Sequence, residues 1–576
     1  MAYCEQCGAK LSPGTRFCEE CGAAVEHEVD VQKTSAGIDI PHVDAANDSP
    51  TQRTFDSAAE IFTNGNWRTK WKKAADAAVG EELGILLTDG VCLMDDVCEE
   101  GSGDSLTEFP ERFAPYGDML RSFRDSAAKR GVRYYLLDLS MSWFCAEGKY
   151  RCGDIASILG ILREIVDVAR PKYLFIIGGE NVIPVMTWDD ETGDDDTVES
   201  DLPYVTLDDT SPWNGQQYAF KNCLRVGRLP SCGCPSEDGE ESRRFFGYFS
   251  SNFGRPATTD GIGHLGRIVP YGLSARVWED ESNDEYSRIA HGRVHVSPDV
   301  DLSSVSVPAN ANLLFFNLHG SNTNKEWYGQ QGWSYPESFA PALLDRPRTP
   351  YFLAVEACYG ARYTGGLTPD ESVLLTAMRN GCIAFLGSSR IAYGTPAPNG
   401  SCADIIIGEF IRRVADGESA GDAYVAGLGL LAEEINSPAG GSDSTVKTMA
   451  EFALYGDPSA CAGQNKNAGG MKKLMKAFSA APKGLHIPIP DVRRVSKMAL
   501  AEVNRKIEAL VDDFAMRELG MDGQTKAFGQ VKMKSFRSTS RPINLKTYSV
   551  GEGIRNRRLR VYFDDKGTIT KSLHSK

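Results

Sequence analysis

The sequence predicts an α/β fold in which helices cover both faces of a doubly wound, mostly parallel sheet. Seven short and nearly uninterrupted apolar runs suit strands that are buried on both faces. Amphipathic stretches such as residues 154–170 and 403–417 alternate with these runs, and such alternation is typical of a parallel sheet. The runs cover residues 82–88, 133–141, 172–179, 267–273, 312–320, 351–360 and 382–389.

The chain divides into four parts by composition and pattern. With 576 residues it is too long for a single core, so several domains are expected. Near the C-terminus, a long amphipathic helical pattern followed by strand patterns predicts a compact α+β unit. This unit would be a regulatory or substrate-docking module, or a segment that blocks a cleft. The parts are a cysteine-rich segment at 1–25, a flexible linker at 26–55, the α/β region at 56–480 (as one domain or as subdomains 56–255 and 256–480), and the α+β unit at 481–576.

Four cysteines near the N-terminus have the spacing of a metal site. Two C-x2-C pairs supply four thiolates, which match the tetrahedral coordination of zinc. A segment this short cannot bury a core, so bound metal would supply its folding free energy. Two disulfides are the alternative, and a reducing cytosol disfavours them. The site resembles small bacterial zinc ribbons with a structural or partner-docking role, and its expected ligands are Cys4, Cys7, Cys18 and Cys21.

Charge and composition narrow the class of function. The formal net charge of −16 argues against a dominant surface for nucleic acid or anionic membranes, because phosphate binding needs clustered Lys and Arg. No stretch approaches the roughly 20 apolar residues of a membrane-spanning helix. The N-terminal residues MAYCEQCGAK lack the features of a signal peptide. We therefore expect a cytoplasmic protein that has neither nucleic acid nor membrane as a partner.

Two predicted strands end on a reactive side chain. His319 and Cys358 each stand at the carboxyl end of an apolar run, where side chains of a parallel sheet emerge into a crevice. Because neighbouring strands lie about 5 Å apart, the imidazole and the thiol could meet. An imidazole within reach makes the thiolate accessible and later protonates a leaving group. The amide of Gly320 could help to hold an oxyanion.

The sequence of this region allows two other interpretations. A lone buried cysteine is usually a small hydrophobic side chain, but that does not explain the strand-end position of Cys358 or the upstream histidine. Ser388 or Ser389, in LGSSR, is the serine alternative, and no G-x-S-x-G elbow surrounds them. The loop that holds Ser388 is therefore expected to line the substrate cleft.

The stretch NLHGSN at 317–322, followed by EACYGA at 356–361, resembles the histidine–glycine and alanine–cysteine motifs of caspase-like (clan CD) cysteine peptidases. More specifically, the chain is similar to the gingipain-type branch of that group. The resemblance implies a caspase/gingipain-like sheet, with Cys358 as the nucleophile and His319 as general base and acid. It also implies that the backbone amides of Gly320 and Cys358 stabilise the oxyanion. Supporting stretches follow in the same order at 174–184, 200–208, 225–230, 384–394 and 454–459.

The resemblance extends to two carboxylates. Glu180, in GGENVIP, is the candidate for the residue that orients the histidine. Asp201, in SDLPY, matches the region that shapes the S1 pocket of arginine-cleaving relatives, where a carboxylate can pair with a basic P1 side chain. Asp201 is equally well interpreted as a structural hydrogen-bond acceptor at a turn.

Two loops bear on specificity. Trp327 and Trp333 lie in an aromatic segment between the histidine and the cysteine, where they would grip an extended peptide or pack under the loop. The acidic segment at 189–201 is expected to be a solvated, mobile loop. A calcium site, or a collar that attracts basic substrates, is the alternative.

Two functions follow from these patterns. The first is an intracellular cysteine endopeptidase that makes limited, regulatory cuts in protein substrates, with zinc in a structural role only. The absence of a secretion signal disfavours the digestive role of secreted relatives. The second is a catalytically inactive caspase-like scaffold or signalling protein that binds partners through the zinc ribbon and the C-terminal unit.

Overall fold

The chain separates into two compact units, residues 1–49 and residues 50–576, and the computed structural model describes parts of the second. The expected zinc ligands and the linker expected at 26–55 lie outside the described residues. The described residues are 67–78, 80–97, 120, 123–140, 150–151, 153–232, 245, 248, 268–345, 350–396, 400–437, 441–462, 497–519, 530–537, 542–550, 557–564, 567 and 569–576.

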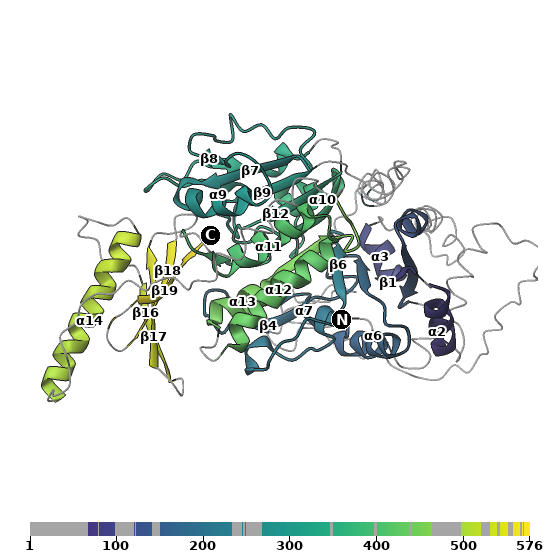
Figure 1. Cartoon of the computed structure of the whole chain (residues 1–576), viewed down its shortest axis with the longest axis horizontal. Helices are drawn as coiled ribbons and strands as arrows, with labels where there is room; N and C mark the ends of the chain where they lie inside the picture. Colours follow the sequence, from purple (N-terminus) through teal and green to yellow (C-terminus); the bar gives the residue numbers. More distant parts are fainter. Residues whose placement is uncertain are drawn as a thin grey trace, which may run out of the picture. The chain divides into compact units, whose positions relative to one another are not determined.

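Ten strands form one large sheet (Figure 1). Their order is β2-β1-β3-β6-β15-β13-β12-β9-β7-β8, and all neighbours pair in parallel except β13 and β15. The predicted α/β class with a mostly parallel sheet is therefore confirmed. The strands are β1 (Glu82–Thr88), β2 (Val132–Asp138), β3 (Tyr173–Ile177), β6 (Arg225–Leu229), β7 (Pro270–Ala275), β8 (His295–Ser297), β9 (Leu313–Asn317), β12 (Tyr351–Val355), β13 (Cys382–Ser388) and β15 (Phe452–Gly456).

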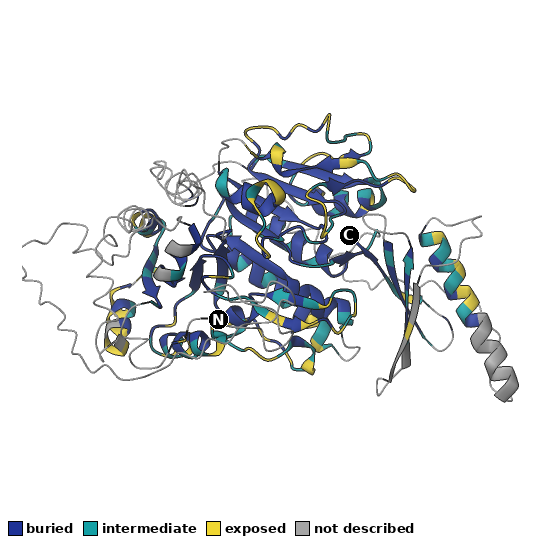
Figure 2. Ribbon diagram, turned by 180° about the vertical axis from the view of Figure 1, so that it is seen from behind, coloured by how far each residue is buried: buried dark blue, intermediate teal, exposed yellow. Residues whose placement is uncertain are grey.

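The sheet is continuous across the chain's two expected halves. Strand β15 comes late in the sequence, yet it pairs with β6 on one side and β13 on the other. The regions proposed as subdomains, 56–255 and 256–480, therefore contribute to one hydrogen-bonded sheet. Figure 2 shows its strands as buried, while exposed residues gather on loops and on the outer sides of helices.

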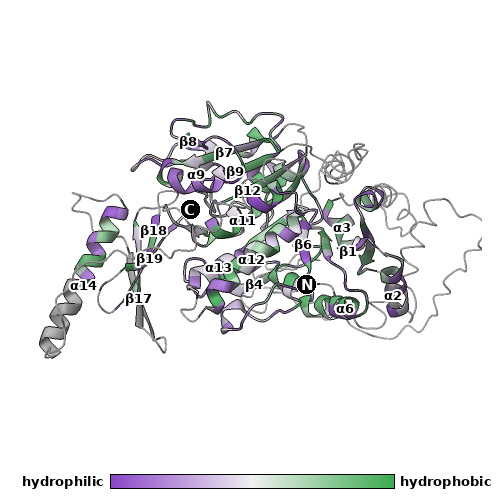
Figure 3. Ribbon diagram, in the orientation of Figure 1, coloured by the Kyte–Doolittle hydropathy of each residue, from purple (hydrophilic) through white to green (hydrophobic). Residues whose placement is uncertain are grey.

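Helix α6 (Ile155–Ala169) owes its position to an apolar face. In this helix, Ile158, Leu162 and Ile165 are buried, and Asp154 caps the first turn by accepting a hydrogen bond from the amide of Ala156 at 3.2 Å. Figure 3 shows both polar (purple) and apolar (green) residues on α6. The large α/β region contains further helices. These are α2 (Trp67–Ala77), α3 (Gly90–Val97), α7 (Leu202–Thr206), α9 (Glu279–Ser287), α10 (Val373–Arg379), α11 (Ala403–Ala415), α12 (Ala420–Asn436) and α13 (Asp443–Glu451), with 3-10 turns η1 (Pro212–Asn214), η2 (Arg276–Trp278), η3 (Pro341–Leu343) and η4 (Pro369–Glu371).

Two short hairpins project from the connections of the large sheet. The first joins β4 (Met186–Asp189) to β5 (Thr197–Ser200), and the second joins β10 (Trp327–Tyr328) to β11 (Glu337–Phe339). The second hairpin lies in the chain between the predicted histidine and the predicted nucleophile.

The C-terminal residues form a helix followed by an antiparallel sheet, as the sequence predicts. They are α14 (Lys497–Glu518), β16 (Gln530–Arg537), β17 (Pro542–Val550), β18 (Arg557–Asp564) and β19 (Ile569–Ser575). The sheet order is β14-β19-β18-β17-β16, so its fifth strand, β14 (Tyr393–Gly394), belongs to the α/β region. The C-terminal sheet is thus completed by a strand that follows β13.

Candidate active site

The strands that carry the predicted catalytic residues are neighbours. In the parallel pair β9 and β12, Phe316 is opposite Val355. His319 and Cys358 each stand three residues beyond this matched position. A Cβ atom at Gly320 would overlap the carbonyl oxygen of Cys358, so the two segments contact each other through their backbones and only glycine fits at position 320.

The imidazole of His319 is held in an aromatic surrounding. Its Nε2 lies 2.7 Å from Oε1 of Gln330. The ring centroid lies 4.4 Å from that of Trp278 and 5.3 Å from that of Tyr335. Burial lowers the pKa of His319 to about 4, against a smaller opposing effect of the hydrogen bond with Gln330. The imidazole is therefore neutral at neutral pH.

The thiol of Cys358 is also buried and neutral. Its sulfur lies 3.6 Å from the carbonyl oxygen of Ala392, and burial raises the pKa of the thiol to about 12. The next residue, Tyr359, has a φ of 55°, a left-handed conformation that marks a sharp and strained turn. The easily formed thiolate expected from the sequence is not present in this state, because burial opposes the charged form of both side chains.

Two backbone amides next to the predicted catalytic side chains have no acceptor among the described residues. Within the described parts of the chain, the amides of Gly320 and Cys358 donate to no acceptor, whereas that of Gly360 donates to Ala357 at 3.0 Å. Free amides next to a nucleophile can hold a developing oxyanion. The expectation for Gly320 and Cys358 stays a prediction.

The structure assigns other partners to the two predicted carboxylates. Glu180 accepts a hydrogen bond from the amide of Gly365 at 3.0 Å, and the ring nitrogen of His319 is bonded to Gln330 instead. Asp201 forms a two-pronged ion pair with the fully buried Arg228, at 2.8 and 2.7 Å. A buried guanidinium needs such a partner, so this ion pair favours the structural interpretation of Asp201, and the S1 role stays a prediction.

The residues predicted to line the cleft have local packing roles. Ser388 is buried, and its hydroxyl donates to the carbonyl of Arg390 at 2.9 Å. Trp327 is buried and stacks on Phe339 with ring centroids 5.4 Å apart. This contact favours the interpretation that the aromatic residues pack under their loop. Trp333 is 37% exposed, and its ring lies 4.0 Å from the guanidinium of Arg557.

The acidic segment at 189–201 is a hairpin tied by cations and not a solvated loop. Nζ of Lys447 lies 2.8 Å from Asp190 and 2.6 Å from Asp195. Asp194 pairs with two arginines of β18, Arg558 at 3.0 Å and Arg560 at 2.8 Å. The expectation of a solvated, mobile loop was wrong. The sequence of the segment does not reveal these partners, because they come from distant parts of the chain. Asp190, Asp194 and Asp195 are thus paired with cations of the same chain, and a calcium site in this segment stays a prediction.

A second cluster, which the sequence reasoning missed, adjoins the predicted pair. We call it the acidic pocket: Glu281 of α9, Asn317 at the end of β9, Glu356 directly after β12, and Asp404 of α11. All four side chains are buried, and they surround the ammonium group of Lys576. The signal in the sequence was a polar residue inside each apolar run, two positions before the histidine and two before the cysteine.

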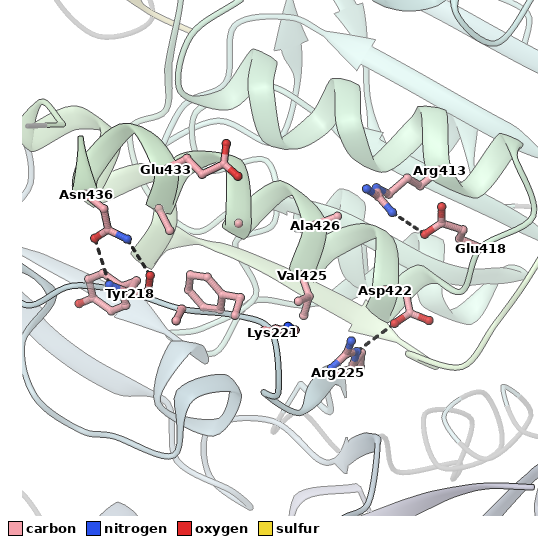
Figure 4. Close-up of a pocket in the computed structure, with 14 residues that line it drawn as sticks. Tyr218, Lys221, Arg225, Arg413, Glu418, Asp422, Val425, Ala426, Glu433 and Asn436 are labelled. Atoms are coloured by element: carbon pink, nitrogen blue, oxygen red, sulfur yellow. Dashed lines mark hydrogen bonds and ion pairs between the residues drawn. The ribbon is translucent and has the colours of Figure 1, made fainter. Parts of the chain in front are cut away.

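A cavity of about 400 Å³ lies elsewhere, between α12 and residues 218–225 (Figure 4). Its walls are held by Arg225, which pairs with Asp422 at 2.9 Å, and by Asn436, which donates to the carbonyl of Tyr218 at 2.7 Å. None of the predicted catalytic or specificity residues lines it. The cavity is therefore separate from the residues predicted for catalysis.

Comparison with known proteins supports the N-terminal prediction. Residues 3–25 match the zinc-ribbon domain family, which confirms the ribbon predicted at 1–25 and indicates zinc binding. A search of curated proteins found no match to the chain. The protein thus combines an N-terminal zinc ribbon with an α/β region built on a large, mostly parallel sheet. No helix in the described ranges has the length and apolar character that crossing a membrane requires.

Proposed function

We propose that the protein is a cysteine endopeptidase in which Cys358 is the nucleophile and His319 is the general base and acid. The observation that carries this proposal is the register of β9 and β12, which ends two adjacent parallel strands on an imidazole and a thiol at matched positions. The sheet is also compatible with the caspase/gingipain-like fold that the motifs resemble. The free amides of Gly320 and Cys358 add the donors that an oxyanion needs.

The proposed reaction proceeds through a thioester. His319 takes the thiol proton while the sulfur of Cys358 attacks the carbonyl carbon of the scissile bond. When the tetrahedral intermediate collapses, the C–N bond breaks and the imidazolium gives its proton to the leaving amine. His319 then takes a proton from water, and the resulting hydroxide attacks the thioester. The carboxylic acid product leaves, and the thiol regains its proton.

The proposed reaction requires the site to open first. With a thiol pKa of about 12 and an imidazole pKa of about 4, the proton stays on sulfur while both groups are buried. Entry of water or of a polar substrate would lower the first pKa and raise the second, because burial is the largest cause of both shifts.

Substitution of the nucleophile tests the proposal. Cys358→Ala should abolish cleavage of a peptide library, read by mass spectrometry of the products, because no other group would form the thioester. Cys223→Ala is the matched control, since that half-buried thiol lies outside the strand-end site. Equal turnover by the wild type and Cys358→Ala would refute the assignment of the nucleophile.

The alternative function is a scaffold whose peptidase-like site is inactive. The burial and the neutral state of His319 and Cys358 favour it. Labelling with an electrophilic peptide probe separates the two functions, because a histidine-paired thiol should react faster than the other cysteines of the α/β region. A uniform reactivity among these cysteines, together with no turnover by the wild type, would favour the scaffold.

A further inference from the structure

One buried arginine of the C-terminal sheet has no carboxylate beside it among the described residues. We propose that Arg557, at the start of β18, anchors a binding site for the carboxylate group of an acidic ligand. The site lies where the C-terminal sheet meets the turn of the β10–β11 hairpin. The proposal is independent of the proposed peptidase function, because binding at Arg557 requires neither Cys358 nor His319.

The other buried arginines show what a guanidinium needs in this protein. Arg228, Arg557 and Arg560 are buried in the described ranges, with 0%, 8% and 1% of their surface exposed. Arg228 pairs with Asp201 at 2.7 Å, and Arg560 pairs with Asp194 at 2.8 Å. Nε and Nη2 of Arg557 have no hydrogen-bond partner in the same ranges. Because a buried charge without a counter-charge is strongly unfavourable, an anion is expected here.

The pKa values of these arginines support the contrast. Burial lowers the pKa of all three guanidinium groups. Neighbouring anionic and phenolic groups outweigh burial at Arg228 and Arg560, whose pKa values are raised. Burial prevails at Arg557, where Tyr335 is the group that opposes it. Arginine stays protonated in proteins, so Arg557 brings a full positive charge into the contact.

The two nitrogens without a partner define the kind of ligand. Nε and Nη2 stand on one edge of the guanidinium of Arg557, and their N–H groups point in parallel toward the two oxygens that a carboxylate would present. The indole of Trp333 lies against the guanidinium, with its ring centroid 4.0 Å from Cζ. One face of the guanidinium is therefore occupied by an aromatic ring, and the edge is left for the ligand.

The charges around Arg557 match a ligand with a single negative charge. Arg557, His574 and Lys576 are the basic side chains that lower the pKa of His319 in the described structure. His574 lies 3.3 Å from Glu518, and Lys576 is held by the carboxylates of the acidic pocket. Arg557 thus carries the uncompensated charge of the three. One such charge suits a carboxylate, whereas a phosphate ester, with about −1.5 to −2 charges at pH 7, would need a second cation.

A ligand reaches the guanidinium when its cover moves. Trp333 is 37% exposed and Arg557 is 8% exposed, so the indole is the part of the cover that faces solvent. Trp333 stands at the tip of a tight turn, in which the backbones of Gln331 and Ser334 are bonded to each other at 3.1 and 3.0 Å. An exposed side chain at such a tip changes rotamer rapidly, and its movement would uncover Nε and Nη2.

The site adjoins the strand-end residues without including them. The ring of Tyr335, which opposes the effect of burial on Arg557, lies 5.3 Å from the ring of His319. Burial is the largest cause of the lowered pKa of His319, and the charge of Arg557 adds to it. A bound carboxylate would neutralise that charge, so an acidic ligand at Arg557 would make the imidazole easier to protonate.

A comparison of two isosteric ligands tests the site in the unmodified chain. The full-length protein is titrated at low salt with N-acetylglutamic acid α-amide and with N-acetylglutamine α-amide, and binding is measured by ligand-observed saturation-transfer NMR. We expect saturable binding of the acid and about tenfold weaker binding of the neutral amide, since only the acid forms the charge-assisted pair. Equal binding of the two ligands, or no binding of the acid, would overturn the proposal.

Substitution of the arginine locates the binding. Arg557→Met keeps an apolar stem and should abolish the preference for the acid. Without ligand, this variant should melt about 2 °C or more above the wild type, because it lacks the buried charge. Arg517→Met is the matched control, since Arg517 is an exposed arginine of α14 that pairs with Asp513 at 3.0 Å. A preference for the acid that persists in Arg557→Met would overturn the assignment.

A measurement on the wild type covers the case in which Arg557→Met fails to fold, which circular dichroism would reveal. N-acetylglutamic acid α-amide should slow the modification of Arg557 by phenylglyoxal about threefold or more at saturation, read by peptide mass spectrometry, and should leave Arg517 unaffected. Equal protection of both arginines, or of neither, would overturn the proposal.

Two further ligands identify the source of the carboxylate. N-acetylglycine presents a chain-terminal carboxylate, whereas the glutamic acid amide presents that of a side chain. Tighter binding of either one supports the site and shows which group of an acidic peptide it takes. Inorganic phosphate should compete with both only weakly. Competition by phosphate at concentrations as low as those of the carboxylates would overturn the assignment to a carboxylate.

Discussion

At the scale of single residues, the imidazole of His319 lies against Trp278 and Tyr335 with its Nε2 bonded to Gln330. Burial is the largest cause of its lowered pKa, and nearby cations, including Lys576, lower it further. A proton on this ring would have no carboxylate to pair with among its hydrogen-bond partners. In this structure the imidazole of His319 is therefore neutral, the form that can accept a proton.

The lowered pKa of His319 makes stability depend on pH. The unfolded histidine binds a proton near pH 6.5 and the folded one only near pH 4, so unfolding takes up a proton between these values. The free energy of unfolding should fall by about 3 kcal/mol as the pH drops from above 6.5 to 4. His319→Gln should lack this loss, which is measured by comparing the melting temperatures of both proteins at pH 7.5 and pH 4.5.

Comparison of the wild type with His319→Gln isolates the contribution of this histidine to the pH dependence of stability. The buried glutamates Glu281 and Glu356, whose pKa values burial raises, titrate in both proteins and drop out of the comparison. Parallel pH profiles for the wild type and His319→Gln would show that His319 is not buried as a neutral ring.

Single residues also show where sequence reasoning reaches its limit. The positions of His319 and Cys358 at strand ends followed from the apolar runs that precede them. The partners of Glu180 and Asp201 did not, because a carboxylate in a motif does not reveal which donor the fold brings to it. For Asp201 that donor is Arg228, on a strand 27 residues later. For Glu180 it is a backbone amide near position 365.

At the scale of elements, long buried strands were predictable and short pairings were not. The runs at 312–320 and 351–360 were expected as strands, and β9 and β12 fall within them. Strand β14 has only two residues, too few to show any period. Its pairing with β19 joins segments about 180 residues apart, and no local pattern encodes such a contact. The acidic pocket was missed for the same reason.

The hairpin β4–β5 should depend on one buried lysine. Lys447 of α13 is fully buried between Asp190 and Asp195. Lys447→Met would leave these carboxylates without their cation, at a cost of about 3–5 kcal/mol. Amides of residues 186–200 should then exchange with deuterium much faster, as followed by mass spectrometry. The exposed Lys221→Met serves as the control.

Two outcomes of the exchange experiment are informative beyond the lysine itself. Unchanged protection in Lys447→Met would show that the backbone pairing of β4 with β5 suffices to order the hairpin. Protection that is lost and then restored by added calcium would show that the segment can bind this ion, as the carboxylate-rich sequence allows.

At the scale of the whole molecule, the chain joins a metal-dependent segment to a domain with its own core. Residues 1–49 and 50–576 are separate compact units, and the match to the zinc-ribbon family lies within the first. The ribbon was predictable because its signal is a local cysteine spacing. The completion of the C-terminal sheet by β14 was not, because it depends on residues from a distant part of the chain.

Removal of zinc should therefore act on one unit only. Four cysteine ligands fill the coordination of the metal and leave no position for substrate, and a ribbon of this size folds only with metal bound. Treatment with 1,10-phenanthroline should release about one zinc ion per chain, measured with a chromogenic chelator. The melting temperature of the α/β unit and the labelling rate of Cys358 should stay unchanged. Cys18→Ser should reproduce the zinc loss without the chelator. The large sheet has its own buried core, so its stability should not depend on the metal. A fall in the melting temperature or a change in Cys358 labelling on zinc removal would show instead that the ribbon supports the α/β unit.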